Sequence, residues 1–231
     1  MKTTLLLIIG CLCGASAWAG GSKSEPKFTE NFPVDKAELA SVGTNRFFIL
    51  SPGYQLVLEG KEKGHTVILT VTVLNETKMV DGVETRVVEE KETVNGQPEE
   101  VSRNFFAISK RTTDVFYFGE EVDIYKNGKI SSHEGAWLSG LNGAHFALAL
   151  PGSPLLGARY YQEVAPKVAM DRAEVISLNE KLVTPAGTFQ DCLKTEETSA
   201  IEKTREYKIY AAGIGLIYDG ELKLRKYGFT P

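Results

Sequence analysis

The stretch HTVILTVTVLNE, residues 65–76, decides the fold of this chain. One of its faces carries aliphatic side chains, at positions 67, 69, 71 and 73, and the other carries threonines, at positions 66, 70 and 72. Strict alternation of apolar and polar residues is typical of a half-buried β-strand. The same alternation returns in ELKLR at residues 221–225, so we expect strands at both ends of the chain.

Turn signals separate these strands at short intervals. Asn95-Gly96, Asn127-Gly128 and Asp219-Gly220 are dipeptides typical of two-residue type I′ hairpins. TPAG, at residues 184–187, predicts a proline-led turn between two further strands. Closely spaced hairpins favour an antiparallel meander over a parallel sheet with crossover helices. The sequence therefore predicts an all-β protein.

One short N-terminal helix is the expected exception. Asp35 is a suitable N-cap, Glu38 follows three residues later, and Val34 and Leu39 occupy the flanking apolar positions. Gly43 provides a stop signal. We expect this helix to cover an edge or an end of the sheet.

The chain also resembles itself at an offset of 104 residues. Without a gap, LNE at 74–76 falls on LNE at 178–180; with small gaps, 102–105 matches 204–207 and 115–120 matches 216–221. Such self-similarity predicts two related meanders, 45–132 and 157–228, within a single domain over 32–231. Turn and strand residues common to any two meanders are the alternative explanation. The pattern leaves open whether the meanders close as one wide barrel, form a curved sheet or pack as a sandwich.

The N-terminal region has the three parts of a secretory signal. Lys2 precedes an apolar run over 3–14, and AWA at 17–19 predicts cleavage after Ala19. The polar stretch 20–31 is expected to be a flexible leader. We therefore predict a secreted or periplasmic protein, although the oligomeric state does not follow from the sequence.

Composition narrows the possible partners. The 231 residues carry a net charge of -4 without a basic block, which argues against nucleic acid as a partner. Residues 135–158 carry no charge, but glycines and prolines interrupt them, so no integral membrane segment is expected after the signal. Two of the three cysteines lie within the signal, which leaves Cys192 without an internal disulfide partner. We expect Cys192 to be buried and inert.

The connector between the two meanders, residues 135–157, is unusually apolar for a surface connection. Three interpretations remain open: a core-filling loop, a lid over an apolar ligand cavity, or a surface that docks a partner or a membrane. If the connector is a lid, its aromatic and imidazole side chains are the expected ligand contacts, namely Trp137, His145 and Phe146.

Catalytic candidates are few. His133-Glu134 pairs an imidazole with a carboxylate, and Glu163, Asp171 and Glu174 form a second loose carboxylate group. Solvent-exposed polar residues are the alternative interpretation of both groups. HExxH, HxH and CxxC motifs are absent from the sequence, so neither a metal nor a cofactor is predicted. The acidic segments 89–92 and 99–100 are expected to keep a protruding hairpin soluble.

Three stretches carry a resemblance to a known group of proteins. NRFFILSPG at 45–53, TPAGTFQDC at 184–192 and YAAGIGL at 210–216 resemble recurring stretches of a group of uncharacterised secreted bacterial proteins. This group has no known activity to carry over to these residues. The layout is also loosely similar to that of envelope β-proteins whose half-barrel binds lipid-like molecules, a likeness of fold rather than of site.

These patterns favour binding over catalysis. The leading hypothesis is an exported, non-enzymatic β-protein that binds an apolar small molecule or an envelope component under the Trp137 connector. One alternative is a hydrolase or metal-dependent enzyme that uses His133 and Glu134 with Glu163 and Asp171. The other is a cell-surface structural module without a ligand.

Overall fold

The computed structural model describes residues 27–230, so the predicted signal peptide and most of the predicted leader lie outside the described residues. Apart from a single 3-10 turn, the regular elements of the described part are all β-strands, which confirms the all-β prediction. Fifteen strands form one antiparallel sheet, and β2 (Gly43–Asn45) and β3 (Phe48–Leu50) form a separate hairpin.

The first meander begins after the positive-φ residue Gly53. Its strands are β4 (Tyr54–Glu62), β5 (His65–Val80), β6 (Val83–Val94), β7 (Gln97–Ser109), β8 (Val115–Lys126) and β9 (Lys129–Ser132). Each strand pairs with the next one in antiparallel fashion. The decisive stretch 65–76 is the first three quarters of β5, and its Val67, Leu69 and Val73 are buried.

The second meander repeats this course. Its strands are β12 (Arg159–Tyr161), β13 (Asp171–Thr184), β14 (Gly187–Ser199), β15 (Arg205–Ala211), β16 (Gly215–Asp219) and β17 (Leu222–Phe229). The last strand, β17, pairs with β4, the first strand of the other meander. The two meanders therefore form one continuous sheet, and β4 and β17 meet in its middle.

The self-similar segments fall on strands of the same rank in the two meanders. Residues 74–76 and 178–180 lie on β5 and β13, the second strand of each, and 102–105 and 204–207 lie mainly on β7 and β15, the fourth. Both meanders also start from a positive-φ glycine, Gly53 or Gly157, whose N–H donates to a carbonyl of the second strand. The sequence repeat thus coincides with a repeat of topology.

The expected helix is reduced to one turn, η1 (Lys36–Glu38). Asp35 acts as its N-cap, with its carboxylate accepting from the Ala37 N–H, as predicted. Leu39 is extended and buried, because β1 (Leu39–Ala40) pairs with β7. The pairing of β1 with β7 therefore ends the helix after one turn. Gly43, which was expected to stop the helix, is instead the first residue of β2.

The type I′ dipeptide predictions hold in two of three cases. Asn95-Gly96 and Asn127-Gly128 have the paired positive φ angles that a type I′ turn requires. Asp219 instead remains in β16, so that Gly220 and Glu221 form the turn to β17. The TPAG turn joins β13 to β14 as expected.

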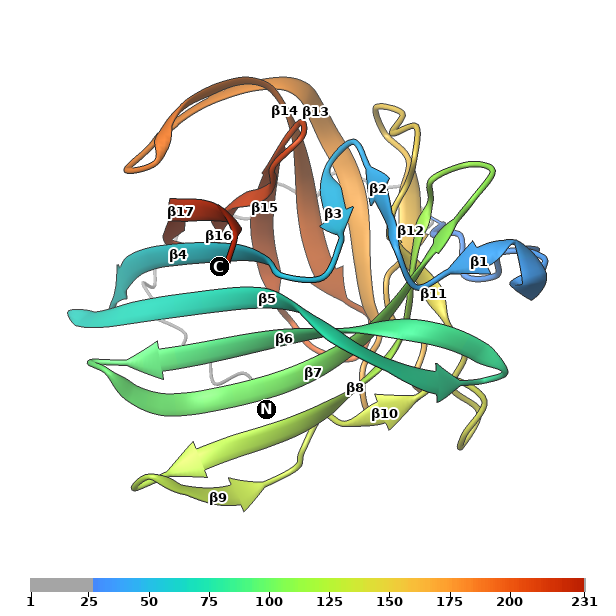
Figure 1. The fold of residues 1–231 in the computed structure, drawn as a ribbon, viewed down its shortest axis with the longest axis horizontal. Coiled ribbons are helices and arrows are strands. Elements are labelled where there is room, and N and C mark those ends of the chain that lie inside the picture. Colours follow the sequence, from blue (N-terminus) through green and yellow to red (C-terminus); the bar gives the residue numbers. More distant parts are fainter. Residues whose placement is uncertain (1–26, 231) are drawn as a thin grey trace, which may run out of the picture.

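The sheet curls on itself, so that β13 and β14 arch over the face of β5–β8, as Figure 1 shows. The connector adds β10 (Trp137–Leu138) and β11 (Ala147–Leu150) to β8. The last residues of the predicted leader are docked on the other end of the sheet, where Thr29 bridges to Tyr160. Two inward faces thus oppose each other, one from each meander.

Candidate functional site

A cavity of about 340 Å³ lies between these inward faces. Its walls come from both meanders, from the β2–β3 hairpin and from the connector. A concave site of this size with mixed apolar and polar walls is typical of small-molecule binding.

The middle of the sheet forms an apolar base. The residues of β4 and β5 that line the cavity are all aromatic or aliphatic: Tyr54, Leu56, Leu69, Val71 and Val73. The Tyr54 hydroxyl donates to the Ile214 carbonyl at 2.9 Å, which turns the polar end of this ring toward the chain before β16. Burial, with Tyr227 nearby, raises the pKa of Tyr54 to about 12. This side of the cavity therefore stays neutral.

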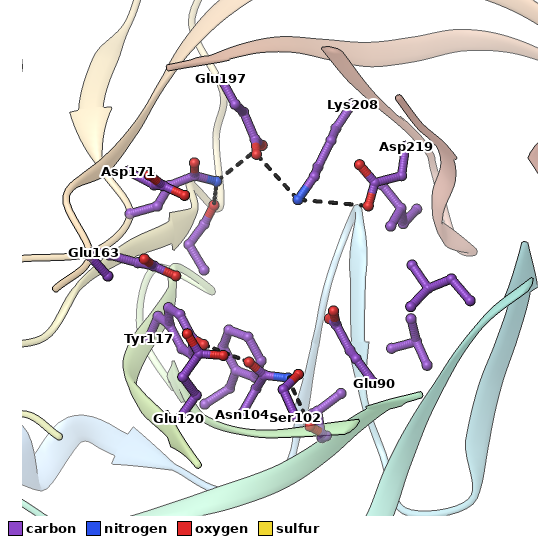
Figure 2. A pocket seen from close by; sticks show the side chains of 18 of the residues that line it. Glu90, Ser102, Asn104, Tyr117, Glu120, Glu163, Asp171, Glu197, Lys208 and Asp219 are labelled. Atoms are coloured by element: carbon purple, nitrogen blue, oxygen red, sulfur yellow. Dashed lines mark hydrogen bonds and ion pairs between the residues drawn. The ribbon is translucent and has the colours of Figure 1, made fainter. Parts of the chain in front are cut away.

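The charged residues of the cavity lie mainly on the two arms of the sheet, which are β6–β8 on one side of the base and β13–β16 on the other. Eleven acidic residues and one lysine are among the described residues that line the cavity. The acidic residues are Glu90, Glu92, Glu100, Glu120, Glu134, Glu163, Asp171, Glu197, Glu202, Glu206 and Asp219, and the lysine is Lys208. Figure 2 shows members of this set on both sides of the open space.

Lys208 is held between two carboxylates. Its Nζ lies 3.2 Å from Glu197 Oε2 and 3.8 Å from Asp219 Oδ2 (Figure 2). Register explains the arrangement, because Lys208 pairs with Asp219 across β15 and β16 and therefore shares its face. Gln162 extends the group by donating to Glu197 Oε1 at 3.2 Å.

The electrostatics of this group favour the ammonium. Burial alone would lower the pKa of Lys208, but the carboxylates of Asp219 and Glu197 outweigh it and hold that pKa well above its usual range. Lys208 is therefore a cation throughout the physiological pH range. An ammonium in this state serves as a structural counterion rather than as a general base.

A hydrogen-bonded trio lies on the opposite arm. The Tyr117 hydroxyl donates to Asn104 Oδ1 at 2.5 Å, and Asn104 Nδ2 donates to Ser102 Oγ at 3.0 Å and to the Val88 carbonyl at 3.2 Å. Burial, together with the carboxylates of Glu120, Glu163 and Glu90, raises the pKa of Tyr117 well above its usual range. The trio presents fixed polar atoms next to the apolar base (Figure 2).

Three of the four catalytic candidates line this cavity. Glu134, Glu163 and Asp171 do so, whereas His133 is not among the lining residues. The ring of His133 is 68% exposed, and its Nδ1 lies 2.8 Å from the Val122 carbonyl and 2.9 Å from Asp123 Oδ1. The structure therefore separates the imidazole from the carboxylates with which it was grouped.

The three predicted ligand contacts lie off the cavity wall. Trp137 is buried, pairs with Glu120 and packs edge-on against the Tyr117 ring at 5.4 Å. Phe146 stacks on Phe118 at 4.8 Å. The core-filling interpretation therefore holds for part of the connector only, because six of its 23 residues are buried and nine are exposed.

The remaining predicted contact, His145, pairs with Val164 through its backbone, and its ring reaches toward Glu30 at 3.8 Å. The connector contributes to the cavity only through Gly135, Ala149 and Leu150. The idea of a Trp137 lid is therefore not supported by this geometry.

The expectation that the acidic hairpin only keeps an edge soluble is wrong for three of its residues. Glu90, Glu92 and Glu100 point into the cavity, because they occupy the inward positions of β6 and β7. Sequence reasoning also missed Glu197, Lys208 and Asp219. The available signal was that β6, β7, β14 and β15 carry ionisable residues on both of their alternating faces, which leaves no apolar face for a dry core.

Within residues 27–230, no group of three or more His, Cys, Asp or Glu side chains is arranged to hold a metal ion. The same part of the chain contains no helix long and apolar enough to cross a membrane.

Comparisons with known proteins add little to this geometry. No family model matches the sequence, and no curated protein matches it. Among solved structures, the crystal structure of a "putative lipoprotein" from Parabacteroides distasonis ATCC 8503 matches 80% of this chain and 100% of its own. The identity is 16% and the TM-score is 0.37. A similarity this low assigns neither a family nor a function to this chain.

Proposed function

We propose that this chain is an exported, non-enzymatic binding protein that holds a small molecule with an apolar body inside its curled sheet. The observation that carries this proposal is the cavity of about 340 Å³ with its apolar base of β4 and β5 side chains. An apolar body that enters this space leaves water and contacts rigid strands rather than loops. The signal pattern over residues 1–19 supports export.

A neutral probe tests the binding function. Nile red, whose fluorescence rises in apolar surroundings, is titrated into the folded protein. Val71→Phe fills the base of the cavity, whereas Thr70→Phe places the same ring on the other face of β5. We expect Val71→Phe to weaken Nile red binding about tenfold or more and Thr70→Phe to leave it near the parent value.

Circular dichroism establishes that both variants remain folded. Equal binding by the two variants, or no Nile red binding by the parent protein, would contradict the proposed function. Export is tested separately by the mass of the protein recovered from the periplasmic or extracellular fraction of its host. A chain that starts at Gly20 supports it, and an intact N-terminus in the cytoplasm opposes it.

A further inference from the structure

We infer that the molecule this cavity binds is an organic cation, with an ammonium or guanidinium group on an apolar body. The inference rests on the proposed function and names the chemical class that the same cavity takes. Three observations carry it: the charge of the walls, their placement and the apolar base between them.

The charge of the walls is strongly one-sided. Among the described lining residues, eleven are acidic and only Lys208 is basic. Glu197 and Asp219 already share that lysine. A cavity lined in this way attracts cations and repels anions, because low-dielectric walls concentrate the field of their charges.

The carboxylates face one another across the space rather than forming one surface cluster. Glu90 lies on β6 in the first meander, whereas Glu197 lies on β14 in the second (Figure 2). The field of Glu90 reaches both walls, since it helps to raise the pKa of Tyr117 on β8 and of Lys208 on β15. A cation between the arms would interact with both walls at once.

The apolar base determines how the ligand is oriented in the cavity. Leu56, Leu69 and Val71 line the cavity in the middle of the sheet, where no described lining residue of β4 or β5 is charged. The acidic residues of the sheet come from the strands on either side of that base. An amphipathic cation therefore fits with its apolar body on the base and its charged group between the arms.

A bare metal ion is a poorer candidate than an organic cation, because no group of three or more described His, Cys, Asp or Glu side chains is arranged to hold one.

Three eight-carbon probes of different charge test the inference: octylammonium, octanol and octanoate. Their affinities are measured by displacement of Nile red and by titration calorimetry at pH 7. We expect octylammonium to bind at least about tenfold more tightly than octanol, and octanoate to bind more weakly than both. The apolar body is the same in all three, so the differences report the charge of the cavity.

A pair of double variants locates the effect. Asp171→Asn with Glu206→Gln removes two carboxylates from β13 and β15, the strands that flank β14, and neither residue holds Lys208. Glu62→Gln with Glu99→Gln removes the same net charge from exposed positions outside the cavity lining. We expect the first pair to reduce the preference for octylammonium over octanol several-fold, and the second pair to preserve it.

The outcomes separate the two proposals. If Nile red and octanol bind but octylammonium binds no better than octanol, the cation inference fails and the proposed function survives. A preference for octylammonium that both double variants reduce equally also overturns the inference, because general charge then explains it. If neither Nile red nor any eight-carbon probe binds, the proposed function fails and the inference fails with it.

Discussion

The ammonium of Lys208 lies 3.2 Å from the carboxylate of Glu197, and both side chains are largely withdrawn from water, with exposures of 23% and 13%. Asp219 completes the group at 3.8 Å. A cation shared by two inward carboxylates offsets their mutual repulsion and the desolvation that the curled sheet imposes on them. Lys208 therefore has a structural role that is independent of any ligand.

Lys208→Met tests this role. The variant keeps the length of the side chain but leaves Glu197 and Asp219 without their counterion, so we expect unfolding free energy to fall by about 2–3 kcal/mol. Lys194→Met on β14 is the matched control. Its partner Glu180 is 4.0 Å away on a more exposed face, and we expect a loss below about 1 kcal/mol.

Urea denaturation at pH 7 measures both variants. Adding Glu197→Gln to Lys208→Met should recover part of the loss, because one of the stranded charges is removed. Equal losses for Lys208→Met and Lys194→Met would show that the inward group contributes no more than a surface ion pair.

Gly119 is required by a close approach of two strands. Its φ is +122°, and a Cβ added there would lie 2.2 Å from the carbonyl oxygen of Trp137, which belongs to β10. Gly119→Ala must therefore push β10 away from β8, and we expect a loss of about 3 kcal/mol or more. Gly128 also has positive φ but has nothing within 4 Å. Gly128→Ala thus isolates the backbone cost, about 1 kcal/mol, and thermal unfolding of the two variants compares them.

Because of Asp81, we expect the unfolding free energy to change with pH in the acid range. Burial tends to raise its pKa, but hydrogen bonds from Lys36 and Ser139 outweigh burial and hold the pKa of Asp81 below its usual range in the folded protein. A lowered pKa means that Asp81 stabilises the fold above about pH 4 and loses this contribution as the pH falls through its folded value.

Asp81→Asn should therefore cost about 1 kcal/mol at pH 6 and progressively less toward pH 3. Asparagine tolerates the positive φ of 48° at this turn, so the backbone is retained. Urea denaturation of parent and variant at several pH values measures the difference. A difference that does not change between pH 6 and pH 3 would contradict the assignment.

Cys192 is predicted to be unreactive in the folded protein. Its side chain is fully buried, and burial, together with Asp191 and Glu180, raises the pKa of the thiol. Thiolate, the reactive form, is therefore scarce at neutral pH. Iodoacetamide labelling, located by peptide mass spectrometry, should modify Cys192 only after denaturation. Rapid labelling of the native protein would show that β14 opens locally.

The fold was more accessible to sequence reasoning than the site. Alternation at 65–76 and the Asn-Gly turns depend on local chemistry, and both were found in the structure. The helix at Asp35 was shortened because pairing of Leu39 with Ser109, a contact between distant residues, overrode local capping. Likewise, Glu90 faces Lys208 and Glu197 only because the sheet curls, and no local pattern specifies that curvature. Alternation identifies two faces of a strand but does not say which face is inside.

The hydroxyl of Tyr117 tests whether the polar wall of the cavity is fixed before any ligand arrives. It donates to Asn104 Oδ1, which fixes the carboxamide so that its nitrogen donates to Ser102 and Val88. Tyr117→Phe removes the donor while the ring keeps its stacking on Phe106 at 4.7 Å. We expect a loss of about 1–2 kcal/mol in unfolding free energy, because the carboxamide oxygen loses its donor in a buried site.

Tyr207→Phe is the control, because the hydroxyl of Tyr207 donates to Glu196 at 3.1 Å and both residues lie outside the cavity lining. This variant should cost less than about 0.5 kcal/mol. Calorimetric unfolding compares the two variants, and equal effects would mean that the Asn104 carboxamide is held by its other hydrogen bonds alone.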